Sequence, residues 1–178
     1  MKSFVPFKIA LICFVMVILE GVTTTFTLPF TNDGQAVFHF LFIFLVLVTI
    51  FFERSHTYYV ILFSLIFSIM IDILYTGVLG VYLFSYSITL YVVRIFMKVF
   101  HSNFYVVLLM MLIGIALTEH IVYFLYKIIL VHDMPWNDFI ADRFITTLSW
   151  NVIMGILFYL LFAKRLEKWS LQKFEENK

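Results

Sequence analysis

Four charged side chains interrupt apolar runs that are long enough to cross a bilayer: Glu20, Asp72, Glu119 and Arg143. A charge exposed to lipid costs several kcal/mol, so groups of this kind face protein or the water boundary. Counted at about 1.5 Å of rise per residue, the three acids lie more than halfway along their runs, and the arginine lies near the start of its own. The four share one depth. We therefore predict that they meet inside a helical bundle.

This predicted polar cluster has two interpretations. The first is a polar pocket or gate that binds a polar group. The second is a structural clasp that fixes the register of the helices, because buried charges are tolerated when they pair and often serve specificity. Three acids with one strong base favour the clasp. A third possibility, that one or two of the acids simply reach the membrane interface, stays open.

Histidine and cysteine give little support for a metal site or a cofactor. Five separate segments supply one histidine each, without His-x-x-x-His spacing: His39, His56, His101, His120 and His132. We expect hydrogen-bonded or interfacial histidines. The neighbours Glu119 and His120 point about 100° apart on a helix, so they form no dyad by themselves. Cys13 stands alone and can form no intramolecular disulfide. The sequence predicts no metal and no cofactor.

The segment 131–138 offers a histidine and two carboxylates. It could bind a cation, but Pro135 and Trp136 are more typical of a solvated connection with a helix breaker and an interfacial anchor. A glycine-rich phosphate loop, a Gly-x-Ser-x-Gly elbow and a Ser/Lys pair are all missing from the sequence. We predict no catalytic residue and no enzyme activity.

A hairpin of two apolar runs, residues 64–98, provides a further candidate surface. Gly77 and Gly80 lie at its break, where glycine permits a sharp turn and a close helix approach. Tyr82 and Tyr86 share one helix face. Ser85, Ser87 and Thr89 make the same run more polar than lipid requires. We expect these residues to pack against other helices or to contact a partner.

The elements that position these groups are transmembrane helices. Of 178 residues, 63% are hydrophobic and 13% are charged, which is too little polar surface for a soluble globule. A spanning helix needs roughly 20 apolar residues. The sequence predicts an all-α, polytopic membrane protein, a single domain (1–178) built as a bundle of six transmembrane helices. The expected spans are 9–30, 37–52, 58–74, 78–99, 104–130 and 139–163, with a short cytoplasmic tail, 164–178.

The positive charges predict the orientation, since cytoplasmic loops carry an excess of Lys and Arg. With six spans, ten of the 12 basic residues lie on one side, and Lys127 and Arg143 lie on the other. We expect both termini in the cytoplasm. The tail mixes Trp169 and other apolar residues with charges, which is typical of a membrane flank; a contact with a partner or with anionic headgroups is the alternative. A net charge of +1 does not suggest a nucleic-acid partner.

Two motifs carry a resemblance to a known family. The first is Asp72-x-x-Tyr-Thr-x-x-Leu-Gly-Val-Tyr-x-Phe84, and the second is Asp142-Arg-Phe-Ile145 followed by Asn151. With Glu20 and Glu119 in their spans, the chain resembles the MreD family of rod shape-determining membrane proteins over nearly its whole length.

The resemblance implies a non-enzymatic scaffold in the plasma membrane of a bacterium, within the machinery that elongates the cell wall. It further implies an MreC-like bitopic partner, with MreB, a RodA-type glycosyltransferase and a class B penicillin-binding protein in the same complex. The family is also similar in fold to the substrate-binding S-components of energy-coupling-factor vitamin transporters. A small-molecule binding subunit of a transporter is therefore the alternative function. The short outer loops favour the scaffold because they supply little lid over a pocket.

The charge asymmetry makes a testable prediction about topology. Thiols introduced by Ser3→Cys and Asn177→Cys should both be inaccessible to an impermeant maleimide in intact cells and should both react after permeabilisation, because the basic flanks hold the termini in the cytoplasm. Labelling of either position from outside intact cells would overturn the six-span orientation.

Overall fold

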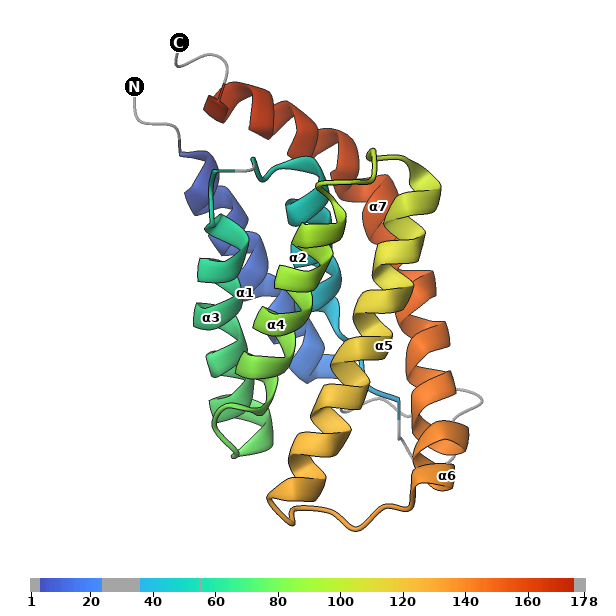
Figure 1. The fold of residues 1–178 in the computed structure, drawn as a ribbon. Coiled ribbons are helices and arrows are strands. Elements are labelled where there is room, and N and C mark those ends of the chain that lie inside the picture. Colours follow the sequence, from blue (N-terminus) through green and yellow to red (C-terminus); the bar gives the residue numbers. More distant parts are fainter. Residues whose placement is uncertain (1–3, 24–35, 55, 175–178) are drawn as a thin grey trace.

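The computed structural model describes residues 4–23, 36–54 and 56–174, and every element in these ranges is helical (Figure 1). The helices are α1 (Val5–Thr23), α2 (Phe40–Phe51), α3 (Tyr59–Ile71), the π-helical turn η1 (Asp72–Thr76), α4 (Val81–Phe96), α5 (Phe104–Ile128), the short α6 (Trp136–Asp138), the π-helical η2 (Phe139–Phe144) and α7 (Ile145–Phe174). The predicted all-α class is confirmed.

Four helical segments are long and apolar enough to cross a membrane: Val5–Thr23, Tyr59–Thr76, Phe104–Ile128 and Trp136–Phe174. Two further apolar helices, α2 and α4, are shorter than this requirement. The chain is thus a polytopic membrane protein. The second part of the first predicted span, the turn after it and the ends of both termini lie outside the described residues.

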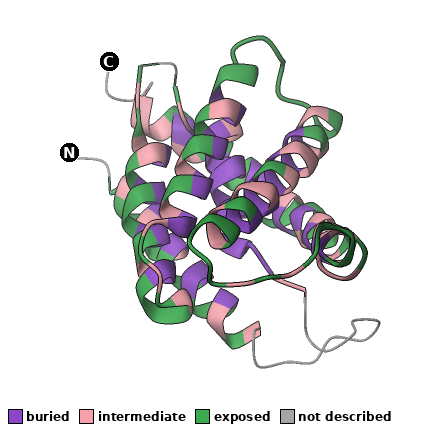
Figure 2. Ribbon diagram, turned by 60° about the horizontal axis from the view of Figure 1, so that its bottom comes forward, coloured by how far each residue is buried: buried purple, intermediate pink, exposed green. Residues whose placement is uncertain are grey.

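The helices pack as an antiparallel bundle in which the start of α1 and the end of α7 lie at the same end (Figure 1). The central element is α2, which contacts α1, α3, α4, α5 and α7. Every residue from Phe40 to Thr49 is buried. A helix that is apolar all round belongs in a core, and Figure 2 shows the buried residues gathered on the inward faces of the bundle.

Close contact with α2 depends on a small residue of α5. A Cβ placed on Gly114 would lie 2.9 Å from two ring carbons of Phe42, which is shorter than van der Waals contact. Glycine at this position therefore lets α5 approach α2 while a large aromatic ring fills the space between them.

The final helix extends beyond the predicted span. α7 continues to Phe174, and its last part runs across the end of the bundle (Figure 1). Ser170 Oγ donates to the carbonyl oxygen of Phe52 at 3.0 Å, and the rings of Phe52 and Phe174 lie 5.6 Å apart. Leu166 is fully buried. One face of the predicted tail thus covers the end of α2.

Candidate functional site

The start of α2 is buried within the protein, where Phe38, His39 and Phe40 are 8%, 0% and 4% exposed. Its 12 residues span about 18 Å at 1.5 Å per residue, against about 30 Å for a hydrocarbon core. The first N–H groups of a helix have no partner within the helix. Irregular backbone at membrane depth is tolerated only where protein surrounds it and satisfies its hydrogen bonds.

Side chains from α1 and α7 satisfy these groups. Glu20 Oε2 accepts from the N–H of Leu41 at 3.2 Å. Asn151 Oδ1 accepts from the N–H of His39 at 2.7 Å, and Thr147 Oγ1 accepts from the N–H of Val37 at 3.1 Å. The Asn151 amide also donates to the carbonyl oxygen of Val37 at 2.6 Å. Thr147 and Asn151 lie four residues apart and therefore on one face of α7. This face binds the backbone of Val37 and His39, the residues that lead into α2.

A chain of hydrogen bonds then crosses the bundle through His39. Its Nε2 lies 2.7 Å from Glu119 Oε1, and its Nδ1 lies 2.9 Å from the hydroxyl of Tyr86. The Tyr86 hydroxyl donates to Glu20 Oε1 at 3.1 Å. On the other side, Arg143 Nε donates to Glu119 Oε2 at 3.0 Å. We call Glu20, His39, Tyr86, Glu119 and Arg143 the polar network.

The polar network joins α1, the segment before α2, α4, α5 and η2. All its members except Arg143 are fully or almost fully buried, and the Arg143 side chain is 24% exposed. Glu119 lies between His39 and Arg143, and Tyr86 links His39 to Glu20. Polar and charged side chains are buried most readily when they are paired and hydrogen-bonded in this way.

Asp72 lies outside the polar network. Its Oδ2 accepts from the N–H groups of Gly80 at 2.8 Å and Leu83 at 3.3 Å, and its Oδ1 accepts from the N–H of Tyr82 at 2.9 Å. It therefore binds the first N–H groups of α4, as an N-terminal cap does. We expected Asp72 to lie with Glu20, Glu119 and Arg143 in one cluster. Its carboxylate instead accepts hydrogen bonds at the start of α4, a second short helix.

The glycines and tyrosines of the predicted hairpin surface lie in the same region. Gly77 (φ 67°) and Gly80 (φ 103°) adopt left-handed conformations that favour glycine. They allow the chain to turn from η1 into α4 within a few residues. The rings of Tyr82 and Tyr86 lie 5.4 Å apart, and both are buried within the chain. These tyrosines therefore pack inside the bundle rather than on a surface for a partner.

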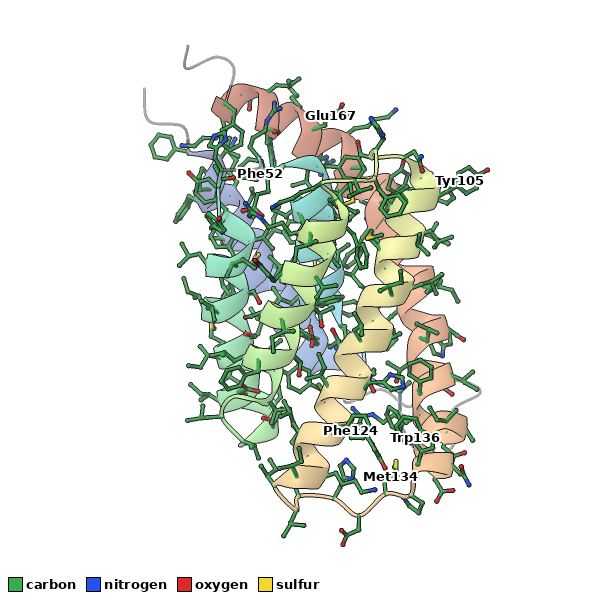
Figure 3. All side chains as sticks on the ribbon, in the orientation of Figure 1. Phe52, Tyr105, Phe124, Met134, Trp136 and Glu167 are labelled. Atoms are coloured by element: carbon green, nitrogen blue, oxygen red, sulfur yellow. The ribbon has the colours of Figure 1, made fainter. Side chains whose placement is uncertain are left out.

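His120 has local contacts and lies outside the polar network. His120 Nδ1 lies 2.7 Å from the carbonyl oxygen of Ala116, and the His120 ring packs on Phe144 at 4.9 Å. Within residues 4–23, 36–54 and 56–174, no group of three or more His, Cys, Asp and Glu side chains could hold a metal ion. The candidate cation loop is held by aromatic contacts: Trp136 stacks on Phe124 at 5.7 Å, near Met134 (Figure 3).

Sequence reasoning missed His39 as the centre of the polar network. The available signal was its position directly before ten consecutive residues that are nearly all apolar. A polar residue there marks a buried helix start. Asn151 was part of a family motif. That it accepts a hydrogen bond at the start of α2 could be seen only in the folded structure.

Comparison with known proteins shows the family. The family model for rod shape-determining protein MreD matches residues 1–169. The rod shape-determining protein MreD of Bacillus subtilis (strain 168) is 32% identical over 168 residues, which cover 92% of this chain and 95% of that protein. The chain belongs to the MreD family. It is therefore a non-enzymatic, rod shape-determining membrane protein of the cell-elongation machinery. No solved structure gives a significant match.

The ion pair of this MreD-family chain predicts a graded mutational response. Arg143→Ala leaves Glu119 without its guanidinium partner, and breaking a fully desolvated pair costs about 3–5 kcal/mol. Because the Arg143 side chain is 24% exposed, we expect the lower part of that range, seen as a lower thermal transition in detergent. Arg143→Lys keeps the charge but loses the planar fork, so it should recover part of the loss.

The matched control for Arg143 is its neighbour. Asp142→Ala, at a half-buried position, should leave the transition almost unchanged. An Arg143→Ala protein with wild-type thermal stability and wild-type support of rod shape would show that the arginine is an ordinary interfacial residue.

The cap of α4 gives a second prediction. Asp72→Ala removes the acceptor of three N–H groups, and loss of a helix cap costs about 0.5–2 kcal/mol, with more where the donors are buried. Asp72→Asn keeps one acceptor oxygen and should lower the thermal transition less. Asp133→Ala, in an exposed loop position, is the control. If alanine and asparagine at position 72 both behave like this control, Asp72 does not cap α4.

Proposed function

We propose that this chain is a six-crossing scaffold subunit of the elongation machinery that docks an MreC-like bitopic protein. MreB, a RodA-type glycosyltransferase and a class B penicillin-binding protein belong to the same complex. Family membership supplies the machinery. The observation that supports the scaffold role is the polar network, which joins five segments of the bundle through buried hydrogen bonds.

A scaffold must present its surfaces at fixed positions, since binding sites on rigid elements lose less entropy when a partner docks. The polar network fixes α1, α4 and α5 relative to the central α2. The potentially reactive side chains, Glu20, His39 and Glu119, bind other groups of the same chain. These hydrogen bonds hold the helices in fixed positions relative to one another.

Six crossings follow if α2 and α4 count as spans. α2 is preceded by backbone that side chains of α7 hold inside the bundle, so it can cross the membrane despite its length. The start of α1 and the end of α7 share one end of the bundle, as an even number of crossings requires. We propose that this end is cytoplasmic, because most of the basic residues belong to it, and that residues 1–178 form a single domain.

Partners meet the apolar outer faces of the bundle. On α4 the polar flank is turned inward, and an apolar stripe at helical spacing faces outward: Phe84, Ile88, Tyr91 and Ile95 are 56%, 50%, 53% and 45% exposed. Transmembrane helices associate through close packing of such surfaces, in competition with membrane lipids.

Co-purification after extraction in a mild detergent tests the scaffold. A tagged wild-type chain should recover an MreC-like bitopic protein and penicillin-binding partners. Recovery of an ATPase module in their place would overturn the scaffold and identify a transporter subunit. Arg143→Ala should reduce partner recovery per amount of folded chain, since it loosens the polar network, whereas Asp142→Ala should match the wild type.

A further inference from the structure

The end of α5 and the residues that follow it form an apolar tip at the end of the bundle opposite the termini (Figure 1). Four consecutive residues make up this α5 tip: Ile128, Ile129, Leu130 and Val131 are 74%, 44%, 84% and 55% exposed. A contiguous exposed apolar patch marks a surface that meets a partner or a membrane. None of the four residues belongs to the polar network.

Leu130 holds a backbone conformation that leucine rarely adopts. Its φ of 58° is left-handed, and it is the one non-glycine residue with a positive φ among the residues that the structure describes. The N–H of Leu130 donates to the carbonyl oxygen of Lys127 at 3.3 Å, and the N–H of Val131 donates to that of Tyr126 at 3.0 Å. These two bonds end a helix in a pattern whose left-handed position is usually glycine. The helix end alone does not explain a large, exposed apolar side chain at this position.

Aromatic packing holds the segment that follows the tip. The Tyr123 hydroxyl donates to the carbonyl oxygen of Met134 at 2.9 Å, and the Tyr123 ring stacks on Phe139 at 4.3 Å. Trp136 and Phe124 stack on each other and are 42% and 50% exposed (Figure 3). Tryptophan and tyrosine are enriched where a membrane meets water. The α5 tip is therefore fixed beside side chains that are typical of the membrane interface.

The length of α5 places its tip in an interfacial layer of the membrane. Tyr105, in the first turn of α5, is 79% exposed and points away from the bundle (Figure 3). From Tyr105 to Ile128 the helix rises about 35 Å at 1.5 Å per residue. The hydrocarbon core is about 30 Å thick, and the core with both interfacial layers is about 40–45 Å thick. A helix that begins in one interfacial layer thus ends in the other, within reach of acyl chains.

The α5 tip also continues the outward surface of α5. Leu117 and Phe124 are 37% and 50% exposed and lie on the same helix face as Ile128. The exposed charges that flank the tip, Lys127 and Asp133, have opposite signs. Binding of such a segment to a membrane depends on the apolar area that it buries. Lipid therefore fits the tip better than a charged surface does.

We propose that the α5 tip inserts into the membrane interface and anchors this end of the bundle at a fixed depth. Ile128 and Leu130 lie beside the ends of acyl chains, and Trp136 lies at the level of the headgroups. The left-handed Leu130 ends the helix sharply and still supplies an apolar side chain, which glycine would not. The anchor is independent of the scaffold role, since it requires no protein partner.

Spin labelling of the full-length chain in dioleoyl phosphatidylcholine vesicles tests the anchor. A nitroxide on Val131→Cys should be more accessible to oxygen, which dissolves in lipid, than to a water-soluble nickel chelate. The ratio of the two accessibilities should be several-fold higher than for a nitroxide on Asp133→Cys. Native Cys13 is buried, and the wild-type chain treated with the same label measures its background.

Variants at position 130 test the side chain itself. Asparagine tolerates the left-handed conformation, so Leu130→Asn in the Val131→Cys chain keeps the backbone and removes the apolar group. Burial of a leucine side chain favours the inserted tip about tenfold or more. The ratio at position 131 should therefore fall towards that at position 133. Leu130→Met should keep the original ratio.

The matched control is Val99→Asn, at a 75% exposed apolar position near the other end of the bundle. It should leave the ratio at position 131 unchanged, and so should dioleoyl phosphatidylglycerol added to the vesicles. Equal ratios at positions 131 and 133, or insertion that requires phosphatidylglycerol, would overturn the anchor. Protection of position 131 that appears only after an elongation partner is added would assign the tip to protein docking instead. The vesicles contain no partner, so failure of the anchor leaves the scaffold test intact.

Discussion

The backbone at the start of α2 is the constraint on which the rest of the structure depends. A helix that begins inside the bundle leaves N–H groups without water, and each unsatisfied group would cost free energy comparable to a lost hydrogen bond. Glu20 of α1 and Asn151 and Thr147 of α7 accept these hydrogen bonds. Since the acceptors come from the first and last helices, satisfying one helix start also positions both ends of the chain around the central helix.

The same constraint explains why three buried acids, Glu20, Asp72 and Glu119, are accompanied by a single arginine in the predicted cluster. Glu20 and Asp72 each accept from N–H groups at the start of a short buried helix, α2 and α4 respectively. Carboxylates in such positions are stabilised by hydrogen bonds and by the positive end of the helix dipole, without a cation for each. Glu119, within α5, is the acid that pairs with Arg143 and His39. The positions of Glu20 and Asp72 therefore follow from where α2 and α4 begin.

Composition and apolar runs were sufficient to predict an all-α membrane protein. A chain with so few polar residues cannot cover a soluble globule and is stable in a lipid bilayer. The motifs from Asp72 to Phe84 and around Arg143 were sufficient to suggest the family. The partners of the acids could not be predicted from spacing. They depend on helix ends, and α2 begins at Phe40, three residues after the expected Val37. Likewise, the contacts of His39 unite four segments that are remote in sequence. The continuation of α7 to Phe174 was also not predicted, because it depends on contacts of the last part of α7 with Phe52.

The charged groups of the polar network are used within the fold. The network sets acids against bases and hydrogen-bonds each of them to the chain itself. Buried charges that are paired in this way fix the helices that carry them, because moving one helix would leave a partner unpaired. A membrane protein built in this way keeps its internal geometry fixed, while its apolar outer faces remain available for packing in the membrane.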